Sequence, residues 1–328
     1  MADRGAGSGQ PGLTPEGTFR DRSRGLVGFG WLLIAAGAAC GLIALSAVAV
    51  ARLAPPGSGA PPLRTVAFNV LLYAALGAAF VVLGIGSIRA RRWARAMALV
   101  TGWVWLATGV LSLVVIAVVL PQTLSAAGAS PGSIACGLGV AALILLIFLV
   151  ALPLAVVLFY RRDDVRRTAE WRNPSPDWSD RATPTVLGVV VALAFGGVVC
   201  LLSVPFLRAI PILGSVVTGI PAALLLLVFS ALSFLLAWGT WRQSPAAWWG
   251  LVALQVFGLV NFLTLRSLDM AAYMKQAGYP DDQIRQAASM NILGSAFMLW
   301  MAVVVSLALL GFLVAIRRHF RGQSPLTG

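Results

Sequence analysis

The feature that most constrains the fold is the length of the uncharged apolar stretches. No charged residue occurs between Arg95 and Arg161, an interval too long for one helix across a bilayer. A transmembrane helix needs about 20 apolar residues, because the hydrocarbon core is about 30 Å thick. The chain is 59% hydrophobic and 11% charged, whereas a soluble domain has about 25% charged residues. These stretches predict an all-α, polytopic transmembrane helix bundle.

Turn residues and arginine clusters divide the apolar sequence into eight predicted spans. Their ranges are 26–51, 65–88, 96–120, 134–160, 185–207, 216–241, 246–265 and 291–316. Pro153 falls inside the fourth span, where we expect a kink because neighbouring helices can satisfy the freed carbonyl group. A further short helix that begins at Asp281 or Asp282 is predicted at the membrane surface.

The distribution of basic residues predicts the orientation. With eight spans, both termini lie on the same side of the membrane. Of the 24 basic residues, only these fall on the other side: Arg52, Arg64, Arg208, Arg266, Lys275 and Arg285. By the positive-inside rule, both termini are expected to be cytoplasmic. The basic residues lie at membrane edges, so we expect contact with membrane lipids and their anionic headgroups at the cytoplasmic face, and no nucleic acid partner.

A strongly charged segment, RRDDVRRTAEWRNPSPDWSDRATP, occupies residues 161–184 and is called the hinge segment below. It is predicted to be a cytoplasmic loop between two four-span halves, residues 25–160 and 185–317. The second half contains a long extracytoplasmic loop, residues 266–290. Residues 1–24 are expected to form a disordered cytoplasmic tail and residues 318–328 a second cytoplasmic tail.

Short patterns recur about half a chain apart, which favours an internal duplication. The recurring pairs are Gly86-x-x-Arg89 and Gly239-x-x-Arg242, Arg161-Arg162 and Arg317-Arg318, and Leu45-Ser46 and Leu202-Ser203. Because four spans return the chain to the same side, the two repeats would be parallel. The alternative is that helices rich in Leu, Ala and Gly simply resemble one another.

Residues for catalysis are missing from the predicted spans, which contain no Asp, Glu, Lys, Arg or His. Intramembrane ionisable residues mark proton relays and catalytic centres. The only histidine, His319, lies in a terminal basic run, so a Ser or Cys nucleophile would have no base. Cys40, Cys136 and Cys200 have no zinc-site spacing. The sequence therefore predicts neither an enzyme nor a metal or cofactor site.

Two sets of residues remain as candidate sites. Amide and hydroxyl residues near the predicted extracytoplasmic helix ends would either cross-link helices or line a vestibule for a neutral or lipidic ligand: Asn69, Asn261, Thr264 and Asn291. Hinge residues would dock a protein partner or anchor the segment at the membrane surface: Trp171, Trp178, Asp180 and Arg181.

Other interpretations of the hinge and of the small residues stay open. The hinge carboxylates would neutralise nearby arginines on a solvated loop, or hold a metal ion or phosphate. Small-residue pairs such as Gly37-x-x-x-Gly41 would pack helices within the bundle or form a homo-oligomer.

Four short motifs of the chain are similar to motifs of other proteins: Phe159-Tyr160, Asp164-Val165-Arg166, Trp178-x-Asp180-Arg181 and Ala277-Gly278-Tyr279-Pro280. With them the chain resembles uncharacterised multi-span membrane proteins of bacteria. The resemblance implies the architecture and a location in the bacterial inner membrane, and it implies no activity. The first expectation for function is a non-enzymatic scaffold or regulatory membrane protein. The alternative is a transporter or channel for a neutral or lipophilic solute, and an enzyme would need its chemistry in the loops.

Overall fold

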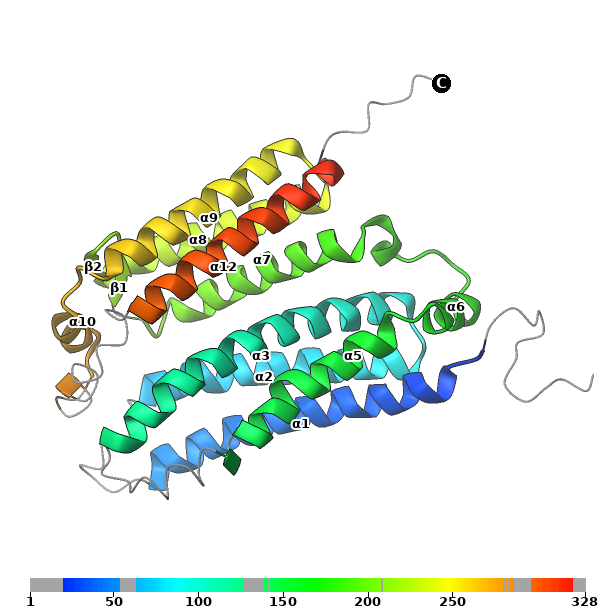
Figure 1. Ribbon diagram of the computed structural model, residues 1–328, viewed down its shortest axis with the longest axis horizontal. Helices are drawn as coiled ribbons and strands as arrows, with labels where there is room; N and C mark the ends of the chain where they lie inside the picture. Colours follow the sequence, from blue (N-terminus) through cyan, green and yellow to red (C-terminus); the bar gives the residue numbers. More distant parts are fainter. Residues whose placement is uncertain are drawn as a thin grey trace, which may run out of the picture. The chain divides into compact units, whose positions relative to one another are not determined.

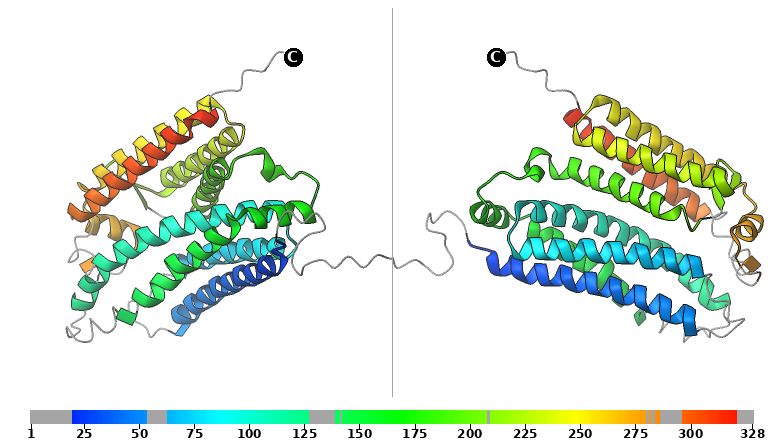
Figure 2. Two further views of the ribbon diagram at one scale, coloured as in Figure 1. Left: turned by 45° about the vertical axis from the view of Figure 1, so that its right-hand side comes forward. Right: turned by 180° about the vertical axis from the view of Figure 1, so that it is seen from behind.

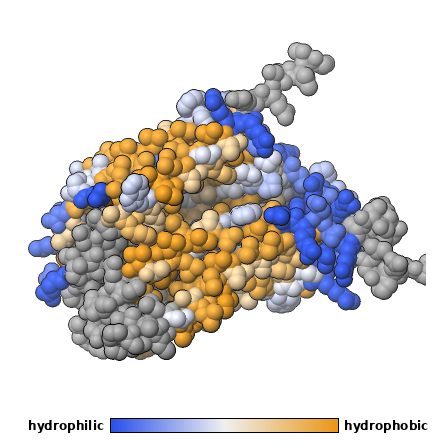
Figure 3. All heavy atoms as spheres, in the orientation of Figure 1, coloured by the Kyte–Doolittle hydropathy of each residue, from blue (hydrophilic) through white to orange (hydrophobic). Residues whose placement is uncertain are grey.

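The computed structural model describes residues 20–53, 63–126, 139–140, 142–207, 209–279, 281, 284–285 and 296–320. Within these residues, eight helices are long and apolar enough to cross a membrane, so the predicted all-α bundle of eight spans is confirmed. On the face drawn in Figure 3, hydrophobic residues cover the flanks of the helices and hydrophilic residues gather at helix ends. That pattern suits lipid around the flanks and water at the ends.

The helices of the first half are α1 (Ser23–Leu53), α2 (Leu63–Ile88), α3 (Arg92–Ala126), the π-helical η1 (Ile147–Ala151), α5 (Leu152–Tyr160), α6 (Asp163–Arg172) and the 3-10 helix η2 (Trp178–Arg181). The later elements are α7 (Pro184–Ser203), β1 (Ala209–Ile212), β2 (Ser215–Thr218), α8 (Gly219–Trp241), α9 (Pro245–Leu265), α10 (Met270–Ala277), α12 (Ala296–Ile316) and the 3-10 helix η3 (Arg317–Phe320). Figures 1 and 2 show them from three sides.

Three features differ from the sequence-based expectations. The third span continues through Pro121 to Ala126 instead of ending at residue 120. A β-hairpin precedes α8, and the helix α10 lies before the expected helix at Asp281 or Asp282. That expected helix falls largely outside the described residues, and so does Asn291.

The chain forms two compact units. Unit 1 comprises Met1–Cys40, Leu76–Leu113 and Ala142–Pro184, and unit 2 comprises Gly41–Ala75, Val114–Ala141 and Thr185–Gly328. In unit 1, α1 and α2 approach closely at glycines: a Cβ atom on Gly37 would lie 2.7 Å from the carbonyl oxygen of Gly77. Such small-residue contacts let transmembrane helices pack backbone against backbone.

The fourth span contains a π-helical turn beside its proline. Pro153 has no N–H and cannot donate to Leu149, the acceptor that an α-helix would assign to it. The residues just before it form the π-helical segment η1. The Leu149 carbonyl oxygen faces α3 at Gly109, where a Cβ atom would overlap it. A glycine on the neighbouring helix thus accommodates the irregular backbone at Pro153.

In unit 2, α7 and α8 are joined where Ser230 donates a hydrogen bond of 2.8 Å to the Gly197 carbonyl. The indole N–H of Trp248 on α9 donates to the Leu313 carbonyl of α12 at 2.8 Å. Trp248 and Leu313 belong to a buried core whose other members are Leu251, Ile316 and Phe320. This core lies at the end of unit 2 where α9 begins and α12 ends.

The hairpin of unit 2 has a two-residue turn. Leu213 and Gly214 both have positive φ, 48° and 76°. A two-residue turn with positive φ at both positions has the same twist as the right-handed twist of the two strands. Such a φ is uncommon for leucine. The side chain of Asn261 on α9 accepts a hydrogen bond of 2.7 Å from the Leu213 N–H and thereby fixes the turn.

The turns between α2 and α3 and between α8 and α9 have the same construction. Ala90 and Gln243 are both left-handed, with φ of 50° and 55°. The Ala90 N–H donates to the Ser87 carbonyl at 2.8 Å, and the Gln243 N–H donates to the Thr240 carbonyl at 2.9 Å. In both turns the glycine before that acceptor faces an alanine at the start of the next helix: Gly86 faces Ala94, and Gly239 faces Ala247.

The helix pair before each turn corresponds as well. In each pair, a glycine of the first helix, Gly37 or Gly197, faces a side chain of the second helix, Val81 or Phe234. Val81 precedes Gly86 by the same number of residues as Phe234 precedes Gly239. These matched contacts support the internal duplication, which stays a prediction.

Candidate functional site

The hinge segment belongs to unit 1 and contains the helices α6 and η2, whereas the sequence predicts a loop. Asp163 and Asp164 occupy the first turn of α6 and Arg172 the last turn, an arrangement that favours a helix through its dipole. Val165 and Ala169 are buried, and α6 contacts the end of α5. In Figure 1, α6 lies beside the end of α5.

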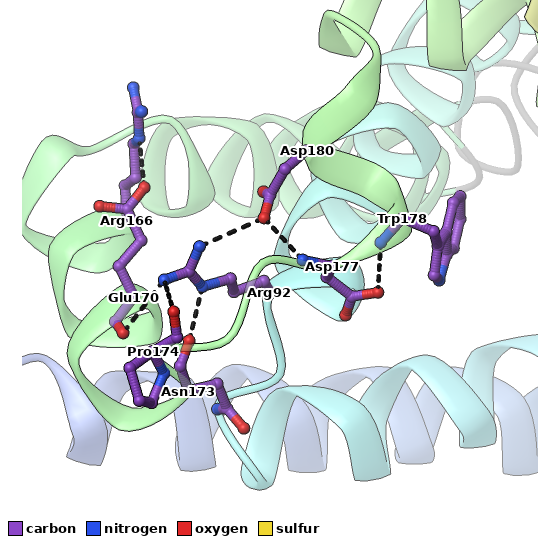
Figure 4. A network of polar contacts seen from close by, with 8 residues as sticks. All are labelled: Arg92, Arg166, Glu170, Asn173, Pro174, Asp177, Trp178 and Asp180. Carbon is purple, nitrogen blue, oxygen red and sulfur yellow. Dashed lines mark hydrogen bonds and ion pairs between the residues drawn. The ribbon is translucent and has the colours of Figure 1, made fainter.

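Arg92, at the start of α3, holds the hinge segment (Figure 4). Its Nε donates to the Asn173 carbonyl at 2.6 Å, and its Nη2 donates to the Pro174 carbonyl at 3.1 Å. Its Nη1 lies 3.2 Å from Asp180 Oδ2. The Asn173 side chain in turn donates to the Ala90 carbonyl at 2.7 Å. One arginine therefore ties the end of α6 and the start of η2 to the α2–α3 turn.

Asp180, one of the predicted docking residues, takes part in this internal network. Its Oδ2 also accepts the Asp177 N–H at 2.9 Å, and Asp177 Oδ1 accepts the Trp178 N–H at 2.7 Å. The first of these contacts belongs to the capping box of η2, in which the Asp177 side chain also accepts the Asp180 N–H. The structure thus places Asp180 as a residue that shapes the hinge, and both Asp180 and the neighbouring Arg181 are exposed.

The two hinge tryptophans are exposed. Trp171 is 47% exposed at the end of α6, and Trp178 is 44% exposed at the start of η2. The Arg172 guanidinium carbon lies 5.5 Å from the centre of the Trp171 ring. In Figure 4 the Trp178 ring points away from Arg92. Both tryptophans thus expose aromatic surface on a segment whose ends are held by Arg92.

The N-terminus of α1 is tied to α6 by two ion pairs. Arg22 lies 3.6 Å from Asp164, and Arg172 lies 3.7 Å from Asp21. Burial acts to raise the pKa of Asp21, but hydrogen bonds from Ser23 and the charge of Arg172 together lower the pKa below its ordinary value of 3.8. Asp21 therefore caps α1 as a carboxylate.

Near the start of the hinge segment, the buried hydroxyl groups of Ser87 and Tyr160 connect the helices α1, α2 and α5. Ser87 Oγ donates to the Leu26 carbonyl at 2.9 Å, so the Tyr160 hydroxyl, 2.5 Å away, donates to Ser87 Oγ. Leu26, Ser87 and Tyr160 are each at most 1% exposed. This pair was not predicted from the sequence, where the available signal was a tyrosine at the end of an apolar span.

The predicted set of amide and hydroxyl residues lies in unit 2. Asn261 holds the hairpin turn, and Thr264 Oγ1 donates to the Asn261 carbonyl at 2.8 Å. The structure therefore brings Asn261 and Thr264 together beside the hairpin. Asn69 is half-buried in α2. Among the described residues, no group of three or more His, Cys, Asp or Glu side chains could hold a metal ion.

These features define the class of protein: a polytopic bundle of apolar helices with a folded, charged segment at the end of one unit. No protein-family model, curated protein or solved structure matches the chain. The function is therefore inferred from the chain's own geometry.

Proposed function

We propose that the protein is a non-enzymatic scaffold or regulatory membrane protein that binds a partner protein at the hinge segment. The observation that carries this proposal is the exposure of Trp171 and Trp178 on a segment held in place by Arg92. Tryptophan and arginine are enriched among the few interface residues that contribute most of the binding energy. A segment already fixed before binding loses little conformational entropy when a partner arrives.

The proposed setting is the bacterial inner membrane, with both termini and the hinge in the cytoplasm. The excess of arginine on that side supports this orientation. A partner at the hinge would then be a cytoplasmic protein or the cytoplasmic part of another membrane protein. A second copy of the chain is one such partner.

The test places a photo-crosslinking amino acid at Ser175, between the two tryptophans, in living cells. We expect a discrete crosslinked protein that disappears in the double variant Trp171→Ala/Trp178→Ala. The matched control is Trp249→Ala, because Trp249 is 60% exposed in unit 2. A crosslink that survives the double variant, or crosslinks to lipid alone, would contradict partner docking.

Transport of a neutral or lipophilic solute is the second candidate. Asn261 and Thr264 lie together near the hairpin, and the fourth span has an irregular backbone at Pro153. Polar groups near helix ends and broken helices are features of transporter sites. Flux of neutral solutes or lipids across liposomes, compared with Asn69→Ala, tests this candidate, since Asn69 does not hold the hairpin turn.

A further inference from the structure

Unit 2 has arginines stacked on tryptophans at the end where α8 stops and α9 begins. The Arg242 guanidinium carbon lies 4.0 Å from the centre of the Trp238 ring. The Arg317 guanidinium carbon lies 4.9 Å from the Trp248 ring. Both distances are within the range of cation–π contacts. Two cations are therefore held at defined places on this end of unit 2.

The two rings place the arginines differently. Trp248 is 7% exposed and its indole N–H is bonded to the Leu313 carbonyl, so Arg317 lies on a rigid platform. Trp238 is 56% exposed on α8, a helix apolar enough to span the membrane. Exposed tryptophans at the ends of spans lie at the level of lipid headgroups. Arg242 is stacked on such a ring.

Unit 2 supplies no carboxylate to this end. Its only acidic residues are Asp269, Asp281 and Asp282, all in the segment between α9 and α12, which begins at the opposite end of α9. In the hinge region of unit 1, by contrast, four arginines each form an ion pair with a carboxylate. The positive charge of Arg242, Arg317 and Arg318 thus has no counter-charge from within unit 2.

We propose that this end of unit 2 binds the phosphate of an anionic lipid headgroup through Arg242 and Arg317. Stacking occupies the face of a guanidinium group and leaves its N–H donors free in the plane, where they match the geometry of phosphate oxygens. The site adds lipid binding to the proposed partner docking and uses none of the hinge residues. Either proposal can fail without the other.

The experiment titrates the delipidated full-length protein with phosphatidylglycerol and counts bound lipids by native mass spectrometry. We expect saturable binding that is weaker by at least about tenfold in the double variant Arg242→Gln/Arg317→Gln. The matched control, Lys275→Gln/Arg285→Gln, removes the same charge from the segment between α9 and α12 and should bind like the wild type. Trp238→Leu, which keeps every charge, should weaken binding by a smaller factor.

Three results would overturn the site. They are equal binding of phosphatidylcholine and phosphatidylglycerol, unchanged binding in the double arginine variant, and an equal loss in the charge control. Should the double variant fail to fold, Trp238→Leu decides the question, because unchanged affinity in that variant would contradict the stacked arginine. Crosslinking at Ser175 should be unaffected by all of these variants.

Discussion

Arg92 and Asp180 form an ion pair of 3.2 Å between the first turn of the third span and the 3-10 helix of the hinge. The Asp180 side chain is 43% exposed, so the ion pair itself contributes little. Arg92 is 17% exposed and also donates to backbone carbonyls of the hinge. The backbone contacts, more than the charge pair, make this arginine the organiser of the segment.

Arg92→Ala is expected to loosen the hinge without unfolding the spans. The variant removes charge-assisted hydrogen bonds, each of which contributes about 1.5–3 kcal/mol. Hydrogen exchange of residues 163–181 should become faster while exchange in α1 stays slow. Arg91→Ala is the control, because the exposed Arg91 side chain has one long hydrogen bond, of 3.5 Å to Asn173, among the described residues. Equal effects of the two variants would contradict a special role for Arg92.

Asp21 should give a pH-dependent contribution to stability. Because its pKa is lowered in the folded protein from 3.8, its carboxylate stabilises the fold above pH 3.8. That contribution is lost as the pH falls through the lowered pKa. The difference in Tm between the wild type and Asp21→Asn should therefore be largest near pH 6 and shrink below pH 3.8. A difference that is constant with pH would show that the charge of Asp21 is irrelevant.

The orientation is tested by reporters. A reporter fused after Arg321 should be cytoplasmic, because the arginines cluster on the side of both termini. Reporters inserted at Ala126 or Ala277 should be extracytoplasmic, because odd numbers of spans precede both positions. Activities of alkaline phosphatase and a fluorescent protein at these positions give the answer. Cytoplasmic signals from both insertions would overturn the eight-span topology.

The spans could be predicted because the bilayer sets their length and excludes charge from it. Local signals also placed the helix ends: the first span, expected at 26–51, is Ser23–Leu53. The hairpin escaped prediction because its strands have four residues each, and its turn depends on Asn261, which lies far along the chain.

The contacts that hold the hinge segment in place could not be predicted from the sequence either. Arg92 looks like any topogenic arginine, and its contacts are with residues about 80 positions away. The buried face of α6 consists of Val165, Thr168 and Ala169, too few apolar residues to stand out among charges. Trp171 and Trp178 could be named from the sequence, but the arginine that holds their segment could not.

Gly109→Ala should destabilise the fourth span. The added methyl group would overlap the Leu149 carbonyl oxygen beside the π-helical turn, and such overpacking costs about 1–3 kcal/mol. Gly28→Ala is the matched control, since a Cβ atom there meets no atom within 4 Å. The measurement is unfolding by dodecyl sulfate in mixed micelles. Similar midpoints for the two variants would mean that α3 and the fourth span are not in this close contact.

Removal of the hydroxyl should destabilise the protein at Ser87 but not at Thr240, the corresponding residue of the second turn. Ser87→Ala leaves the buried Tyr160 hydroxyl and Leu26 carbonyl without their partner, which costs about 1–3 kcal/mol. Thr240 is fully buried, and its hydroxyl has no hydrogen-bond partner among the described residues.

Thr240→Val therefore removes an unsatisfied polar group and should leave the free energy of unfolding unchanged or raise it. The same micellar unfolding assay measures both variants. Equal destabilisation would mean that the Ser87 hydroxyl contributes no more than that of Thr240, and that the tie between α1, α2 and α5 is unimportant. The predicted contrast would instead mean that the hydrogen bonds of Ser87 stabilise the first turn, whereas the hydroxyl of Thr240 does not stabilise the second turn.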